Sequence, residues 1–293
     1  MNLNGRRRSN NVDDRRGSSR GKAIGLGGGI GALVIAALLT WLSGGNPLSV
    51  LTDGSGLQMI TQQSGSTDDG SYQPSAEEQE LADFSSQILA GTEDVWTQQF
   101  REMGLEYEAP KMVLYTGSIQ TACGTGNAQI GPFYCSADQT VYLDLSFFQN
   151  MRRDIGADGD FAYAYVIAHE VGHHVQYLLG TLDEAHSQMQ RVSEAEANRI
   201  SVRLELQADY YAGVWANHDN QMFGSLEPGD VEEALTAAQK IGDDYLQEKA
   251  RGYAVPETFN HGTSEQRERW LTKGLRTGSV TGGDTFSIPY SRL

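Results

Sequence analysis

Apolar residues recur at three- and four-residue spacing through most of the second half of the chain, which predicts a domain built mainly of helices. We expect helices over residues 76–103, 160–180, 187–217, 230–250 and 264–274. Two short runs with strand-like composition, residues 111–116 and 140–145, predict strands. Because the strands come early and the helices late, we predict a helix-dominated α+β domain with a small sheet.

The predicted helix 160–180 is apolar on almost every side, as a buried helix is. It nevertheless contains the run His-Glu-Val-Gly-His at residues 169–173. Histidines four positions apart lie on one face of a helix, so His169 and His173 can bind one Zn²⁺ ion. Glu170 then lies beside the metal, where its carboxylate can take a proton from a zinc-bound water. The alternative, two surface histidines beside a solvated glutamate, is disfavoured by the apolar surroundings.

A catalytic zinc site has three protein ligands and one open position. In helix 187–217, Glu205 and Asp209 lie beside a stripe of apolar residues at helical spacing. We predict that Glu205 is the third ligand and that Asp209 accepts a hydrogen bond from the free ring nitrogen of a ligand histidine. Rival acidic and imidazole ligands lie in a more polar and less periodic stretch: Asp183, Glu184, His186, Glu194 and Glu196.

His261 is a candidate for stabilising the oxyanion that forms during amide hydrolysis. It lies in a predicted loop just before a helix that Thr263 or Ser264 could cap. The alternative is a surface histidine without a catalytic role. His174 adjoins the zinc motif but points about 100° away around the helix, so we do not expect it to bind the same metal.

The predicted strand 140–145 has two interpretations that the sequence does not separate. It is either an ordinary strand of the sheet or an edge strand that pairs with an extended peptide substrate above the metal.

These motifs together resemble the bacterial neutral zinc metallopeptidases that are anchored by one N-terminal membrane span. The resemblance covers nearly the whole chain. It implies a zincin-like, gluzincin-type metallopeptidase domain with zinc as cofactor and a protein or peptide as substrate. A more distant likeness to the CAAX-type membrane proteases, which pair a His-Glu-x-x-His helix with a later Glu-x-x-x-Asp helix, supports Glu205 as a ligand and draws attention to His261. The segments that carry the resemblance to the neutral zinc metallopeptidases are residues 5–7, 11–16, 123–124, 131–135, 141–148, 169–176, 205–213 and 261–264.

Residues 24–42 carry no charge and would extend about 28 Å as a helix, enough to cross a bilayer core. Arginine and lysine dominate the preceding residues, which predicts a basic cytoplasmic tail over 1–23 and a catalytic domain outside the cytoplasmic membrane. The alternative is a cleaved signal peptide, which the long basic leader and the lack of an Ala-x-Ala site disfavour. Glycine spacing in the span also permits a homodimer, although so glycine-rich a run gives that spacing easily.

The composition of the remaining chain divides it into three parts. Residues 43–75 are rich in Ser, Gly, Gln, Asp and Thr and predict a flexible linker. Residues 76–275 are long enough to form one metallopeptidase domain. Residues 276–293 predict a C-terminal tail that lies along the surface or is loose.

The chain has two cysteines, Cys123 and Cys135. Outside the cytoplasm such a close pair predicts a disulfide, and the rival interpretation, a second metal site, lacks a nearby histidine. The net charge of −16 disfavours nucleic acid as a partner.

The sequence therefore predicts a membrane-anchored, zinc-dependent endopeptidase. Two alternatives stay open. One is a non-catalytic zinc-binding or chaperone-like envelope protein, and the other is a zinc amidase that acts on cell-wall peptides by the same chemistry.

Overall fold

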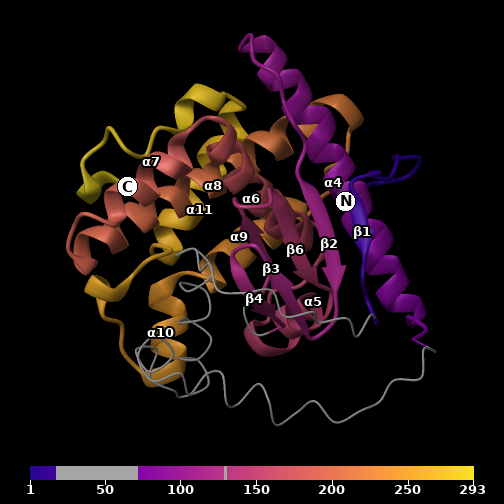
Figure 1. Cartoon of the computed structure of the whole chain (residues 1–293), viewed down its shortest axis with the longest axis horizontal. Coiled ribbons are helices and arrows are strands. Elements are labelled where there is room, and N and C mark those ends of the chain that lie inside the picture. Colours follow the sequence, from indigo (N-terminus) through magenta and orange to yellow (C-terminus); the bar gives the residue numbers. More distant parts are fainter. Residues whose placement is uncertain (18–71, 129–130) are drawn as a thin grey trace.

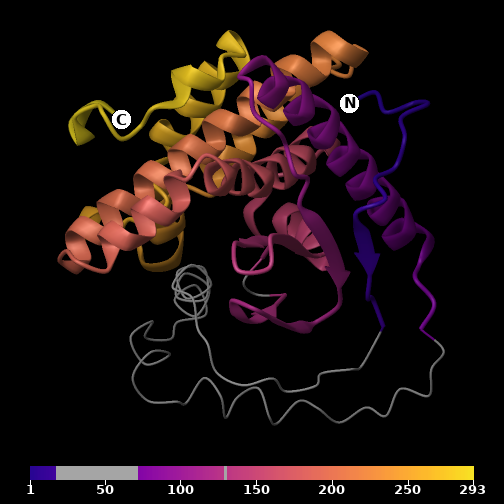
Figure 2. The ribbon, with the colours of Figure 1, turned by 45° about the horizontal axis from the view of Figure 1, so that its top comes forward.

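A layer of helices covers one face of a small sheet (Figures 1 and 2). The computed structural model describes residues 1–17, 72–128 and 131–293. The sheet has the strand order β1-β2-β6-β5, in which β1, β2 and β6 are parallel and β5 is antiparallel to β6. These strands are β1 (Val12–Asp14), β2 (Lys111–Tyr115), β5 (Phe133–Cys135) and β6 (Thr140–Asp144). The predicted helix-dominated α+β class is confirmed.

Two different cores cover the two faces of the sheet. Met112 and Leu114 of β2 point into the main hydrophobic core with the helices. Val113 and Tyr115 of the same strand point to the opposite face, as side chains alternate along a strand. There they pack beneath a hairpin of β3 (Ser118–Thr121) and β4 (Gly124–Asn127).

Strand β6 pairs with β2 on one side and β5 on the other. All five of its residues are buried, as expected for a strand inside a sheet that is covered on both faces. It therefore cannot take up another strand. Residues 140–145 therefore form an ordinary strand of the sheet and not an edge strand that could pair with a substrate. The edge strand on this side is β5.

The helices follow the expected order, but two of the predicted helices are each divided. Residues 187–217 contain the end of α7 and most of α8, because the side chain of Ser193 accepts a hydrogen bond from the N–H of Glu196 and starts a new helix. Residues 230–250 contain α9 and α10, which are separated at Gly242, where the backbone is extended. Thr263 caps the last long helix through a capping box with Gln266. The helices are α4 (Ala76–Glu102), α5 (Ser146–Asn150), the π-helical turn η1 (Met151–Ile155), α6 (Asp160–Leu178), α7 (Thr181–Met189), α8 (Glu194–Phe223), α9 (Asp230–Lys240), α10 (Asp243–Arg251), η2 (Pro256–Thr258), α11 (Ser264–Thr277), η3 (Val280–Gly283) and η4 (Tyr290–Arg292).

The C-terminal segment after α11 packs against α8. Arg203 donates a hydrogen bond to the main-chain oxygen of Ile288 at 3.0 Å, and Gln207 donates one to that of Gly283 at 2.8 Å. Thr285 is fully buried. Residues 276–293 thus lie along the domain and are not a loose tail.

Residues 1–17 are part of the folded domain, which differs from the expected separate tail over residues 1–23. Strand β1 forms the edge of the sheet next to β2. Arg6 forms an ion pair of 2.6 Å with Asp219 of α8; the Asp219 side chain is fully buried and 9% of the Arg6 side chain is exposed. Ser9 donates a hydrogen bond of 2.5 Å to Glu93 of α4.

The predicted span 24–42 and most of the predicted linker lie outside the described residues. Within the described ranges, no helix is long and apolar enough to cross a membrane. The residues on either side of the undescribed stretch lie close together. A Cβ on Gly17 would lie 2.1 Å from the ring of Tyr72, and the Arg16 side chain donates a hydrogen bond to the main-chain oxygen of Glu78 at 3.0 Å.

Replacing Arg6 tests whether the N-terminal segment belongs to the fold. R6A leaves the buried carboxylate of Asp219 without its cation, so we expect the free energy of unfolding to fall by about 3 kcal/mol. The matched control is R8A, because Arg8 and Asp83 form an exposed pair at 2.8 Å whose loss costs less than about 1 kcal/mol. Urea unfolding of the full chain measures both. Equal, small losses for the two variants would contradict this packing.

Candidate metal centre

Three side chains from two helices converge on one point. His169 and His173 come from α6 and Glu205 from α8, and their ligand atoms all lie within 4.8 Å of one another. His169 Nε2 is 3.2 Å from one carboxylate oxygen of Glu205, and His173 Nε2 is 3.5 Å from the other. Two imidazole nitrogens and a carboxylate are donors that Zn²⁺ prefers, so the arrangement fits zinc.

The two helices can approach this closely because α6 has a glycine at the contact. A Cβ on Gly172 would lie 2.9 Å from the main-chain oxygen of Ala208 on α8. Gly172 lies between the two histidines, and Ala208 lies one helical turn after Glu205. A larger residue at position 172 would push α8, and the Glu205 carboxylate with it, away from the imidazoles.

Buried polar groups hold the first ligand histidine. Asp209 accepts a hydrogen bond of 2.8 Å from His169 Nδ1, as predicted, and another of 2.6 Å from the Tyr165 hydroxyl. Arg267 of α11 donates two hydrogen bonds of 2.9 Å to Asp209. Although burial opposes its ionisation, Arg267 and His169 hold the pKa of Asp209 below its usual value. The carboxylate therefore fixes the ring with Nε2 toward Glu205.

A different residue orients the second ligand histidine. The Nδ1 atom of His173 hydrogen-bonds to the side-chain oxygen of Gln176 at 2.9 Å. Gln176 in turn donates to the main-chain oxygen of Leu204 on α8 at 2.7 Å. Both ligand rings thus have Nδ1 engaged by the protein and Nε2 directed to the centre, as metal-binding histidines usually have.

Glu170 lies beside the three ligands and is not one of them. Its side chain is buried. Burial above all raises its pKa, while the two ligand histidines and the main-chain N–H of Tyr134 act in the opposite direction. A carboxylate with a raised pKa is a better base near neutral pH than an ordinary glutamate.

The edge strand β5 is fixed to the zinc helix by residues that sequence reasoning missed. The hydroxyl of Tyr134 hydrogen-bonds to His174 Nδ1 at 2.8 Å, and His174 Nε2 donates to the main-chain oxygen of Glu108 at 2.7 Å. Burial lowers the pKa of His174 to about 4, so the ring stays neutral. His174 points away from the metal ligands, as expected, and its role is to anchor β5.

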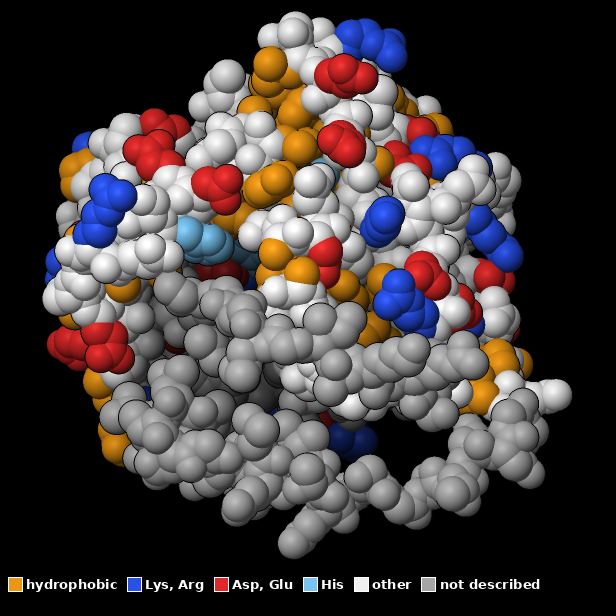
Figure 3. Space-filling view, viewed as in Figure 1, with side chains coloured by type: hydrophobic (Ala, Val, Ile, Leu, Met, Phe, Trp, Pro, Cys, Tyr) orange, Lys and Arg blue, Asp and Glu red, His pale blue; other side chains and the backbone are white. Residues whose placement is uncertain are grey.

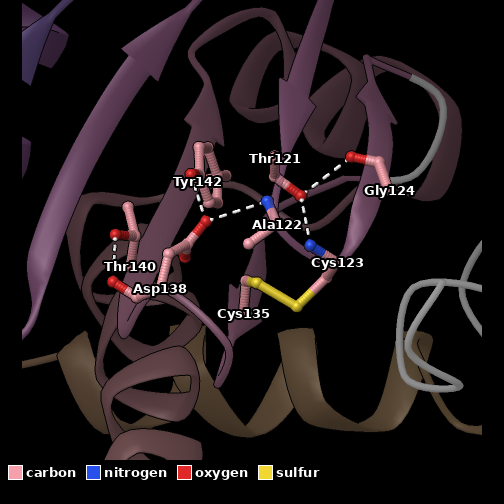
Figure 4. The surroundings of a disulfide bond; sticks show 8 residues. All are labelled: Thr121, Ala122, Cys123, Gly124, Cys135, Asp138, Thr140 and Tyr142. Carbon is pink, nitrogen blue, oxygen red and sulfur yellow. Dashed lines mark hydrogen bonds between the residues drawn. A yellow bond between two sulfur atoms is a disulfide. The ribbon is translucent and has the colours of Figure 1, made fainter. Parts of the chain in front are cut away.

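The predicted disulfide between Cys123 and Cys135 is confirmed, with Cα atoms 5.8 Å apart. It joins the turn of the β3–β4 hairpin to the end of β5 (Figure 4). Asp138 supports the same corner, since it accepts hydrogen bonds from the N–H of Ala122 at 3.1 Å and the hydroxyl of Tyr142 at 2.8 Å. The edge strand is thereby held at two neighbouring residues, Cys135 by the disulfide and Tyr134 by His174.

The structure also places the other candidate residues. His261 lies on the loop before α11, and its charge and that of Glu205 interact. The rival acidic residues Asp183, Glu184, Glu194 and Glu196 are exposed and not part of the metal cluster, and neither is His186. Histidine and acidic side chains are visible in a recess of the surface in Figure 3.

A second acidic cluster is occupied by the chain itself. Asp160, Asp230 and Glu233 lie close enough to hold a cation. The amino group of Met1 lies 2.6 Å from Asp160 and 3.2 Å from Asp230. We therefore assign no metal to this cluster.

Glu205 and Glu196 lie on the same helix and provide a matched pair for testing the metal ligands. E205Q removes the only anionic donor of the three, so we expect bound zinc per chain to fall to near zero at micromolar metal, or affinity to drop at least about 100-fold. E196Q changes an exposed side chain and should bind zinc like the unaltered protein. Unchanged zinc content in E205Q would rule Glu205 out as a ligand.

Zinc affinity should depend on pH through His169. Although burial opposes the charged ring, Asp209 and Glu205 raise the pKa of His169 to about 10 in the metal-free protein. A protonated imidazole cannot bind metal, so zinc must displace this proton below that pH. We expect affinity to rise about tenfold per pH unit between pH 6 and pH 8, measured by competition with a chelator of known pH dependence. A flat profile would show that His169 is neutral before zinc binds.

Comparison with known proteins gives relatives over the full length. A protein of Escherichia coli (strain K12), named "Uncharacterized protein YpfJ", is 49% identical over 293 residues, which cover 98% of this chain and 99% of that one. "Uncharacterized protein Mb2605" of Mycobacterium bovis is 43% identical over 191 residues, or 62% of this chain and 64% of the relative. No solved structure matches the chain.

Residues 1–286 match the family described as "Putative neutral zinc metallopeptidase". The match includes the N-terminal segment that packs on the domain, both ligand helices and the loop of His261. The metal-binding residues and Glu170 described above lie within this match. The chain therefore belongs to the neutral zinc metallopeptidase family.

Proposed function

We propose that this protein is a zinc-dependent peptidase in which Glu170 acts as general base and then as general acid. The proposal is carried by one observation: His169, His173 and Glu205 converge on a single point, while the buried carboxylate of Glu170 lies next to them without being a ligand. When bound, Zn²⁺ supplies the Lewis acidity that activates water and polarises the carbonyl of the scissile bond. Glu170 receives the proton of the attacking water and passes it to the leaving amine.

The number of ligands supports an enzyme over a purely structural zinc protein. A structural site is closed by four protein ligands. Among the described residues, this cluster has three, which leaves one coordination position for water or substrate. A buried base directly beside the open position has no purpose in a structural site.

The edge strand β5 supports a peptide as the substrate. Its inner edge pairs with β6, and no described strand pairs with its outer edge. The N–H of Tyr134 on β5 is among the groups that lower the pKa of Glu170, which is consistent with β5 lying beside the proposed base. An extended peptide that adds to this edge would bring its backbone amide to Glu170 and the metal.

The place of action is a further part of the proposal. The disulfide favours an oxidising compartment, which agrees with a domain outside the cytoplasmic membrane. Residues 1–17 pack on the same domain, and membrane association through residues 24–42 is part of this proposal.

Replacing Glu170 separates metal binding from catalysis. In E170Q of the full chain we expect zinc per chain to be unchanged and kcat/KM to fall at least about 100-fold, because the amide cannot accept a proton. The control E196Q should keep full activity. Substrates are a fluorogenic peptide library and, in parallel, cross-linked cell-wall peptides, so that a peptidase and an amidase give different outcomes. Full activity of zinc-loaded E170Q would overturn the mechanism.

A further inference from the structure

We propose that Asp243 is a positioning residue that orients His261 as a hydrogen-bond donor to the substrate carbonyl at the metal centre. The inference rests on the proposed function and adds two residues to it. Asp243 is the first residue of α10, and His261 lies 18 positions later on the loop before α11.

A single carboxylate holds both the loop and the ring. One oxygen of Asp243 accepts hydrogen bonds from the N–H groups of Asn260 at 2.8 Å, His261 at 2.7 Å and Gly262 at 3.1 Å. Its other oxygen lies 3.2 Å from His261 Nδ1. Because an ionised carboxylate only accepts hydrogen bonds, Nδ1 carries the hydrogen in this pair. Both side chains are largely buried, with 2% of Asp243 and 11% of His261 exposed.

The loop is packed against the turn of α8 that carries the third ligand. A Cβ on Gly262 would lie 3.2 Å from a methyl group of Leu206 and 3.3 Å from one of Val202. These residues flank Glu205 in the sequence. Gly262 has φ +95°, a conformation that side-chain-bearing residues rarely adopt, so the turn after His261 is built for glycine. The loop therefore keeps His261 beside the metal site.

The other ring nitrogen of His261 remains available. Nδ1 is held by Asp243, whereas Nε2 has no hydrogen-bond partner in the described part of the chain and is not fully enclosed. By contrast, both nitrogens of His174 are engaged. A buried imidazole with one nitrogen fixed by a carboxylate and the other free, next to a metal ligand, is suited to donate to the negative charge that develops on a carbonyl oxygen.

The neighbouring aspartate provides a matched control. Asp244 also anchors this region, because one of its oxygens accepts hydrogen bonds from the N–H of Ser264 at 2.7 Å and from its hydroxyl at 2.8 Å. Among the residues that the structure describes, Asp244 forms no hydrogen bond or ion pair with a histidine. D244N therefore removes a loop anchor of the same kind without changing the partner of His261.

The test is a double-mutant cycle in the full chain, with zinc content checked for each variant. We expect H261A to lower kcat about 100-fold with little change in KM. D243N should lower kcat at least about 10-fold on its own and cause no further loss in the H261A background, since residues that act as a unit are not additive. D244N should leave kcat unchanged.

Three outcomes would overturn the proposal or its basis. An equal loss from D243N with and without His261 would show a structural role only. Full activity of H261A while E170Q is inactive would refute the role of His261 and leave the proposed function intact; active E170Q would refute the function itself. If D243N does not fold, D243E keeps the charge and the loop acceptor but displaces the carboxylate from Nδ1, and the same cycle is run with it.

Discussion

The close contact between α6 and α8 is the constraint on which the metal centre depends. Backbone meets backbone where Gly172 faces Ala208, and this brings a carboxylate on one helix within reach of two imidazoles on the other. Packed interiors do not yield easily to added atoms. The glycine inside the zinc motif is therefore as much a part of the site as the residues that bind the metal.

A line of buried charges extends the same constraint to a third helix. Arg267 of α11 binds Asp209 of α8, which binds His169 of α6. Each of these charges would be costly to bury alone, and together they satisfy one another. The helices can approach because α8 and α11 cross at glycines: a Cβ on Gly213 would lie 2.3 Å from the main-chain oxygen of Leu271. The hydrogen bonds that orient the metal ligand His169 are therefore the same ones that join α6, α8 and α11.

Sequence patterns predicted those parts of the site whose residues lie close together in the sequence. Helical spacing identified His169 and His173 as neighbours and placed Glu205 and Asp209 on one face, and the structure brings all four together. Arg267 was missed because its partner lies 58 positions away and no periodicity connects the two. The pairing of β1 with β2 was missed for the same reason, since a short polar run at the start of a chain gives no sign of a distant strand. Its basic residues predicted a cytoplasmic tail, whereas the first of them, Arg6, forms an ion pair with the buried Asp219.

The position of β1 has a practical consequence for any shortened form of this protein. Strand β1 occupies the outer edge of β2, and a fragment that starts after the uncharged region would lack it. The amide and carbonyl groups along that edge would then be unpaired, and an open edge of this kind invites strands from other molecules to add to it. A catalytic fragment designed by removing the N-terminal residues is therefore expected to aggregate, even though every residue of the metal centre is retained.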